Sequence, residues 1–441
     1  MTSLRRWCSL CVAAGALAGR PAASVPAQAP QVPATLTPAL RSGLVDSIAE
    51  RLERSYIEAD TGRLIAEGIR KRFRAGAYDR LDNPAQFADA VTRDLRAVNG
   101  DLHLGLRFSP GGGGPQGPGD PRRINFGIGK VEILDGNVGY LEITGFAGAP
   151  GYEEAVADAL KLLARTDALI IDLRRNGGGS SEMSHLVFSH FLPAHPVETI
   201  RVKRRGAEPV VRRSMAVVPG PRRTDVPLFL LTSRGTASAA EEFTFVLKNR
   251  HRATLVGSRT AGAGHMVNGF PVGSGFILSV SFTRVSDPAT GKEWEQVGVE
   301  PDSAVPPDEA LTVAHAAALR GALAASKDPD WTRSLTRSLA ALEARRRPPG
   351  GRLDGSWLAR VAGDYEGRVV SVKAGRLFYT RRAGGLGEEL TWLGGTRFAL
   401  GPVQLQFEEV GGQVQLTLEP PDGTRLTLRR TGVSPPPGGK T

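Results

Sequence analysis

Two stretches of the chain place reactive residue types where a buried strand gives way to a helix. In LTSRGTASAAEEF, an apolar run from Pro227 to Leu231 leads through a turn into a predicted helix from Ala237 to Lys248. Ser238 stands at that junction, where its hydroxyl would be exposed as a nucleophile and the N–H of Ala239 would face a developing oxyanion. The alternative is that Ser238 or Thr236 only caps the helix.

The second stretch is IIDLRRNGGGSSE, residues 170–182. A buried strand ends there, and three glycines, Gly178 among them, lead into a helix. Glycines let backbone N–H groups face a small anion, and the helix N-terminus adds positive potential. The alternatives are a plain strand-to-helix turn and a phosphate loop, although the Gly-Lys-Ser/Thr ending of such a loop is absent.

Two further stretches carry ionisable side chains. NGDLHLGLRF, residues 99–108, holds His103 between two leucines, and GKEWEQVGVEPD, residues 291–302, holds three glutamates including Glu295. A carboxylate can orient a histidine that acts as a general base. The alternatives are a structural histidine and ordinary surface acids.

The N-terminal residues 1–29 have the layout of a secretory signal peptide. Two arginines precede a short apolar run, Trp7 to Ala18, and small residues follow it. An ordinary N-terminal helix is the alternative. Cys8 and Cys11 are the two cysteines of the chain, so the exported form would have no disulfide, no cysteine metal site and no thiol nucleophile.

Composition sets the broad class of the protein. The chain has 441 residues, of which 41% are hydrophobic and 23% charged, as in globular proteins with two or three domains. The formal net charge is +11, but the arginines are scattered and no nucleic-acid-binding motif accompanies them. We therefore expect a solvated basic surface, no nucleic-acid partner and no membrane insertion after signal removal, with the protein exported to the periplasm or secreted.

Apolar periodicity divides the rest of the chain into segments. Residues 36–108 are predicted to form a helical cap, because Leu44, Ile48 and Leu52 recur every four residues and Asn83-Pro84 is a typical helix start. A Gly/Pro linker is predicted for residues 109–124. The remaining predicted segments are a catalytic α/β domain at 125–310, a helical linker at 311–350, an all-β domain at 355–431 and a disordered tail at 432–441.

The motifs, taken in order, resemble those of the tail-specific, or C-terminal-processing, serine peptidases. They are DLRRNGGG, TSRGTASAAEEF, VGSRTAGAGH and WEQVGVEPD, and GNVGYLEITGF at 136–146 resembles the strand that opens the catalytic domain of that family. The resemblance covers roughly residues 36–310. It implies a crotonase-like (ClpP/crotonase) α/β catalytic domain with Ser238 at the nucleophile position.

Two departures indicate which branch of the family this chain resembles. The branch with a Ser–Lys dyad has its lysine about 25 residues after the serine, where this chain has Ala263, and Lys248 is in the wrong place. Between His103 and Val138 there is no room for a PDZ module. Both features favour the branch that resembles interphotoreceptor retinoid-binding protein and the tricorn core protease. That resemblance makes His103 the general base and gives it a supporting glutamate.

Elementary chemistry agrees with this assignment. A serine hydroxyl needs a base at neutral pH, and histidine has its pKa near 6.5. Glu295 would fix the tautomer of His103, while the N–H groups of Gly178 and Ala239 would form the oxyanion hole. His265 is the rival base, and the rival carboxylates are Glu241, Glu242 and Glu293.

The sequence therefore predicts an exported serine-type endopeptidase that forms an acyl-enzyme on Ser238. We expect a peptide or protein substrate and neither a metal nor an organic cofactor; the sequence sets no oligomeric state. One alternative is a catalytically degenerate protein of the same fold that binds hydrophobic ligands, although such a protein would be expected to lose the serine, the histidine or the glycine loop. The other is a general esterase, which would share the acyl-transfer machinery.

Overall fold

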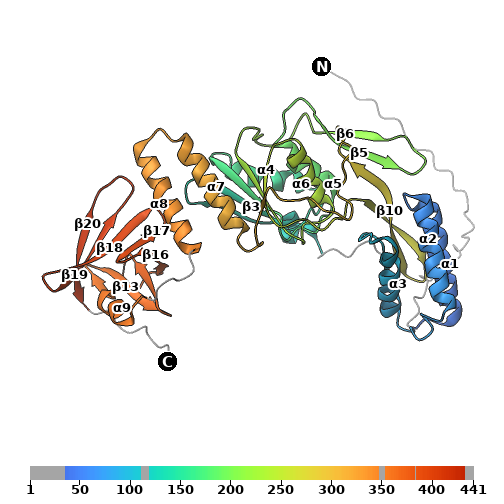
Figure 1. Ribbon diagram of the computed structural model, residues 1–441, viewed down its shortest axis with the longest axis horizontal. Coiled ribbons are helices and arrows are strands. Elements are labelled where there is room, and N and C mark those ends of the chain that lie inside the picture. The colour runs from blue at the N-terminus through green and yellow to red at the C-terminus, as the bar shows by residue number, and fades with distance from the viewer. Residues whose placement is uncertain (1–34, 111–118, 347–352, 383, 433–441) are drawn as a thin grey trace, which may run out of the picture.

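The computed structural model describes residues 35–110, 119–346, 353–382 and 384–432. Within these ranges, N-terminal helices are followed by a central α/β part with two sheets and then by a C-terminal β part (Figure 1). The predicted signal peptide at 1–29, the middle of the linker at 109–124 and the tail beyond Gly432 lie outside the described residues. No helix in the described ranges is long and apolar enough to cross a membrane.

Three amphipathic helices begin the described chain. In two of them a proline is the first helical residue and the residue before it caps the helix. The side chain of Thr37 accepts the N–H of Leu40, and Asn83 Oδ1 accepts the N–H groups of Ala85 and Gln86. The third helix ends at Gly100, whose φ of 72° reverses the chain toward His103. The bounds are α1 Pro38–Ser55, α2 Ala59–Arg74 and α3 Pro84–Asn99.

The first sheet has five strands, and the alternating apolar stretch FILSVSF at 276–282 predicts one of them. That strand, β10, extends to Ser286 and pairs with β1, β5 and β9. In β5 the buried Ile200 and Val202 alternate with Arg201 and Lys203, but the alternating stretch is short. Strand β6 has no buried residue, and β9 is interrupted by a glycine and a proline. The bounds are β1 Gly105–Phe108, β5 Glu198–Arg204, β6 Val210–Arg213, β9 Met266–Gly273 and β10 Phe276–Ser286.

The N-terminal helices share one hydrophobic core with this sheet. Ile48 of α1 and Phe87 of α3 are fully buried in the same cluster as Phe276 and Leu278 of β10. Strand β1 is fastened to α3 as well, because the Thr92 hydroxyl accepts the N–H of Leu106 and donates to its carbonyl. The segment that carries His103 is thus fixed to the central part of the protein despite the Gly/Pro linker that follows it.

The second sheet is predominantly parallel and is covered on both faces. Strands β3, β4, β7 and β8 run parallel, β2 is an antiparallel edge strand, and every residue of β4 is buried. Helices α4, α5 and α6 pack on one face and α7 on the other. The strand bounds are β2 Ile128–Leu134, β3 Val138–Ile143, β4 Ala168–Asp172, β7 Leu228–Thr232, β8 Thr254–Gly257 and β11 Ser303–Ala304, and the helix bounds are α4 Tyr152–Leu162, α5 Ser181–Ser189, α6 Ala239–Asn249 and α7 Ala310–Ala325.

The C-terminal part is β-rich, as the alternating pattern predicts. A long helix, α8 Pro329–Arg346, precedes it and contacts it, since Arg337 donates to the Glu419 carbonyl and forms an ion pair with the Glu419 side chain (Figure 1). Its elements are α9 Gly355–Val361, β12 Gly363–Tyr365, β13 Arg368–Lys373, β14 Arg376–Thr380, β15 Glu388–Glu389, β16 Thr391–Gly394, β17 Arg397–Leu400, β18 Val403–Val410, β19 Gln413–Glu419 and β20 Leu426–Gly432.

Candidate active site

Neighbouring parallel strands bring the glycine loop to the serine turn. Strands β4 and β7 pair in register, so the loops at their carboxyl ends meet at one edge of the sheet. The N–H of Ala237 donates to the Asn176 carbonyl at 3.0 Å. A Cβ on Gly178 would lie 2.8 Å from Ser238 Cβ, so glycine alone fits there. The two motifs identified from the sequence therefore form a single site.

Ser238 has an unusual backbone conformation. Its φ of 54° and ψ of −120° lie outside the regions favoured by residues with a side chain. Glu241 Oε2 accepts the Ser238 N–H at 3.0 Å, and the Glu241 N–H donates to the Ser238 carbonyl oxygen at 2.8 Å. Strain of this kind, of order 1–3 kcal/mol, is concentrated at functional sites. Helix α6 starts directly after this turn, and Ser238 is partly exposed.

The Ser238 hydroxyl points to a histidine from a distant part of the sequence. His103 Nε2 lies 3.2 Å from Ser238 Oγ. The backbone around His103 is held by Asp101 Oδ1, which accepts the His103 N–H at 2.9 Å, and by Arg96, which donates to the Leu104 carbonyl at 2.8 Å. The structure thus brings together the nucleophile and the base that sequence analysis selects.

Burial lowers the pKa of His103 below its ordinary value. The Asp101 carboxylate opposes this shift, whereas His265 and Arg96 add to it as nearby positive charges. A lowered pKa keeps the imidazole neutral at neutral pH. Its Nε2 is then free to accept the proton of the serine hydroxyl, with the ring proton on Nδ1.

The structure does not pair Glu295 with His103. Glu295 Oε2 accepts the N–H groups of Gly264 at 2.6 Å and His265 at 2.9 Å, and it lies 3.8 Å from His265 Nδ1. Within the described part of the chain, His103 Nδ1 is buried without a hydrogen-bond partner. The carboxylate that sequence analysis expected to orient the base instead contacts the rival histidine and its loop.

The two predicted oxyanion donors differ in their availability. Ala239 is the first residue of α6, so its N–H has no acceptor within the helix and points out of the N-terminus. The N–H of Gly178 already donates to Asn176 Oδ1 at 2.9 Å. In this structure the Gly178 N–H is engaged by the Asn176 side chain, which closes its own turn, and the role of Gly178 as an oxyanion donor stays a prediction.

Of the rival carboxylates, Glu241 contacts the site most closely. Its fully buried side chain accepts hydrogen bonds from Thr260 Oγ1, from the N–H groups of Gly262 and Ala263, and from Ser238. Burial raises the pKa of its carboxyl, and these hydrogen bonds oppose that shift.

Glu241 and Asp101 are functional candidates whose roles sequence analysis missed. Glu241 stands three residues after Ser238, which is capping-box spacing, and Asp101 stands two residues before His103, where an aspartate can accept the backbone N–H. The other two rival carboxylates lie elsewhere: Glu242 accepts a hydrogen bond from Ser181, and Glu293 forms an ion pair with Arg284.

Comparison with known proteins places the serine turn, the glycine loop and Glu295 in one family segment. Residues 137–305 match Peptidase family S41. This segment is a peptidase S41 domain. His103 lies outside the matched segment, so the S41 domain receives its histidine from the preceding helical part of the chain.

The relatives are similar over only part of this chain and of their own length. A carboxyl-terminal-processing protease of Synechocystis sp. is 32% identical over 171 residues, covering 38% of this chain and 38% of that protein. The chloroplastic carboxyl-terminal-processing peptidase 2 of Arabidopsis thaliana is 31% identical over 173 residues, covering 38% and 32%. This chain thus spans less than two fifths of the length of either relative.

Solved structures show more distant similarity. A lipoprotein from Streptococcus agalactiae has a TM-score of 0.46 at 17% identity and covers 63% of this chain and 96% of its own. A photosystem II D1 C-terminal processing protease has a TM-score of 0.40 at 17% identity, covering 60% and 93%.

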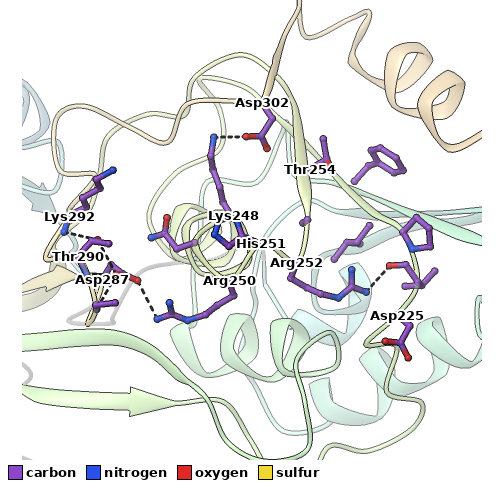
Figure 2. A pocket seen from close by; sticks show the side chains of 17 residues that line it. Asp225, Lys248, Arg250, His251, Arg252, Thr254, Asp287, Thr290, Lys292 and Asp302 are labelled. Carbon is purple, nitrogen blue, oxygen red and sulfur yellow. Dashed lines mark hydrogen bonds and ion pairs between the residues drawn. The ribbon is translucent and has the colours of Figure 1, made fainter. Parts of the chain in front are cut away.

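One cavity lies away from the serine turn of the S41 domain. It has a volume of about 710 Å³ and surrounds the C-terminal end of α6, whereas Ser238 precedes the N-terminal end (Figure 2). Two of its basic side chains form ion pairs: Lys248 with Asp302 at 2.9 Å, and Arg250 with Asp287 at 3.2 Å. An 11-residue helix is about 16 Å long, so this cavity cannot hold a group that reacts at Ser238.

Proposed function

We propose that this protein is a serine peptidase of family S41 that cleaves peptide or protein substrates, as a C-terminal-processing peptidase does. The observation that carries the proposal is the contact of 3.2 Å between His103 Nε2 and the hydroxyl of Ser238, a residue in a strained turn at the start of α6. Such a nucleophile–base pair is the minimum required for acyl transfer by serine.

The chemistry proceeds in two halves. Ser238 Oγ attacks the scissile carbonyl carbon while its proton passes to His103 Nε2. The resulting imidazolium then donates that proton to the leaving amine, which leaves an acyl group on Ser238. In the second half, His103 takes a proton from water, the hydroxide attacks the ester, and the serine hydroxyl is regenerated.

The developing oxyanion would be stabilised at the N-terminus of α6. The Ala239 N–H and the positive end of the helix dipole face it directly. Gly178 lies against Ser238 and would add a second donor once its N–H leaves Asn176 Oδ1. Loss of one such donor typically costs about 3–4 kcal/mol of transition-state stabilisation.

The remaining parts of the proposal concern fold detail, location and supporting groups. The central part would be a crotonase-like catalytic domain, and residues 1–29 would direct export to the periplasm or the medium. Glu295 would support the base only indirectly, through the loop that carries His265.

Active-site labelling tests the proposed function. A fluorophosphonate probe should modify the wild-type protein at Ser238, as located by peptide mass spectrometry, and should not modify Ser238→Ala. Cleavage of a peptide library by wild-type protein, with no cleavage by Ser238→Ala, would distinguish a peptidase from an esterase that accepts only small esters. A protein that neither reacts with the probe nor cleaves any peptide would contradict the proposal and favour a ligand-binding role.

A further inference from the structure

Three ionisable side chains that are largely buried, Asp101, His265 and Glu295, form a cluster next to the turn that carries His103. His265 Nδ1 is 3.4 Å from Asp101 Oδ2 and 3.8 Å from Glu295 Oε2. Asp101 is fully buried, His265 is 8% exposed, and the Glu295 side chain is 10% exposed. The imidazole of His265 therefore stands between two carboxylates that water hardly reaches.

The cluster joins two parts of the protein. Asp101 belongs to the turn between α3 and β1, which also carries His103, whereas His265 and Glu295 belong to loops of the S41 domain. The Asp101 carboxylate contacts both histidines, because Oδ1 accepts the His103 N–H and Oδ2 faces the His265 ring. A second bond crosses the same boundary, from Gln296 Nε2 to the Asn99 carbonyl at 2.6 Å.

Three of the four carboxylate oxygens of the cluster accept hydrogen bonds from protein donors, and among the described residues Glu295 Oε1 is buried without a partner. Tyr56 donates its hydroxyl to Asp101 Oδ2 at 3.0 Å, and Glu295 Oε2 accepts two backbone N–H groups. The three side chains have the composition of a metal site, with ligand atoms within 4.8 Å of one another. Because the oxygens that face His265 already accept these hydrogen bonds, a protonated imidazole is the cation that fits best between them.

We propose that His265 is a positioning residue, and that its imidazolium bridges Asp101 and Glu295 and so holds His103 against Ser238. This inference rests on the proposed function of the Ser238–His103 pair. The alternation of negative, positive and negative charge favours the observed arrangement. With His265 neutral or absent, two buried carboxylates would face each other, and their repulsion would push the turn that carries His103 away from the S41 domain.

The charges around His265 make the bridge dependent on pH. Burial lowers the pKa of His265, but Asp101 and Glu295, with a smaller contribution from Glu58, raise it above its ordinary value overall. His103 faces the same cluster as a neutral ring, and burial raises the pKa of the neighbouring Tyr56 hydroxyl, which stays uncharged. The bridge is therefore complete below about pH 6.5, the ordinary pKa of histidine, and is lost as pH rises through the raised value.

The test is the rate at which the fluorophosphonate probe labels Ser238, measured from pH 5 to pH 9. The variants are His265→Gln, Asp101→Asn and the double variant, and the matched control is His195→Gln, which changes an exposed histidine. A misplaced base should lower the maximal labelling rate of each single variant at pH 7 by about 10- to 100-fold, with little change in the probe concentration for half-maximal rate. The double variant should be no slower than the slower single variant, because both changes break one bridge.

The pH profile separates positioning from simple structural support. Wild-type labelling should fall at high pH as the bridge is lost, and His265→Gln should lack this alkaline decline. His265→Gln labelling at the wild-type rate with an unchanged profile, or fully additive losses in the double variant, would overturn the inference. A loss of rate on EDTA treatment that Zn²⁺ restores would also overturn it, in favour of a metal site.

Two controls keep the outcomes distinct. Circular dichroism shows whether each variant folds, and Asp101→Asn keeps an oxygen for the His103 N–H, so it tests the bridge if His265→Gln does not fold. If wild-type protein is not labelled at Ser238 at all, the proposed function fails. If wild-type protein is labelled and the variants match it, only the positioning role fails.

Discussion

His103 Nε2 lies 3.2 Å from Ser238 Oγ although 135 residues separate the two along the chain. His103 is held in place because β1, the strand that follows it, pairs with β10. Ser238 lies in the turn after β7, a strand of the parallel sheet. Both segments are fixed by buried side chains, so the pair is held by the fold and does not depend on the Gly/Pro linker between the helical part and the S41 domain.

Replacement of the nucleophile should remove activity without unfolding the protein. Ser238→Ala should lose labelling and peptide cleavage, since the attacking oxygen is gone. Because Ser238 has a positive φ, Ser238→Gly should be more stable than Ser238→Ala, by about 1 kcal/mol in urea unfolding. Equal stability of the two variants would show that the turn is not strained, and retained cleavage in Ser238→Ala would show that another residue is the nucleophile.

The base should give an acid limb in the pH–rate profile. Burial lowers the pKa of His103, so the neutral form persists below pH 6.5 and the rate of labelling should fall only as pH drops through that lowered value. His103→Ala should lower peptide turnover by about 10²- to 10⁴-fold, while His195→Gln, the exposed control, should match wild type. A rate that keeps rising well above pH 8 would indicate a lysine base instead.

Glu241 should be required for stability. Its carboxylate accepts hydrogen bonds from four donors, two of them from the backbone of Gly262 and Ala263. In Glu241→Gln an amide NH₂ would face N–H groups and leave buried donors unpaired. We expect a loss of about 2–4 kcal/mol in the free energy of unfolding, measured with urea at pH 7. A loss below 0.5 kcal/mol would mean that the loop does not depend on this side chain.

The neighbouring Glu242 provides a matched comparison, because its replacement by glutamine should stabilise the protein above neutral pH. It is buried, and burial raises the pKa of its carboxyl to about 7. A raised carboxyl pKa favours the protonated folded form, so wild-type stability should fall between about pH 4.5, the value in the unfolded chain, and pH 7. Glu242→Gln resembles the protonated acid and should lack this decline, and it should be more stable than wild type at pH 8. Parallel stability curves for the two proteins would contradict the raised pKa.

The mature protein should begin between about Ala23 and Val32 and contain no cysteine, because Cys8 and Cys11 both lie in the predicted signal peptide. Intact mass of protein recovered from the periplasm or the medium measures this directly. An exported chain that keeps Met1 would show that residues 1–29 are not removed.

Local sequence patterns were sufficient for several elements. The Asn83-Pro84 start of α3 depends on a cap and a fixed proline φ, and the buried strands β4 and β7 depend on unbroken apolar runs. The β-rich character of the C-terminal part also follows from the alternation of polar and apolar residues in its sequence. The first sheet was largely missed, because β5 and β6 are short and carry several arginines, and no residue of β6 is buried.

The sequence by itself determined the order of the motifs, which indicates the S41 segment. It also placed Ser238 at a strand–helix junction and, with no lysine at the position of the Ser–Lys dyad, favoured His103 as the general base. Only the tertiary structure decided which carboxylate contacts which histidine or backbone N–H group. Glu295 was expected beside His103, yet it binds the loop of His265, while Asp101 contacts both histidines and Glu241 holds the serine turn. Sequence spacing cannot give such pairings, because a carboxylate interacts over a few ångströms through space and the chain between these residues is folded through two different sheets.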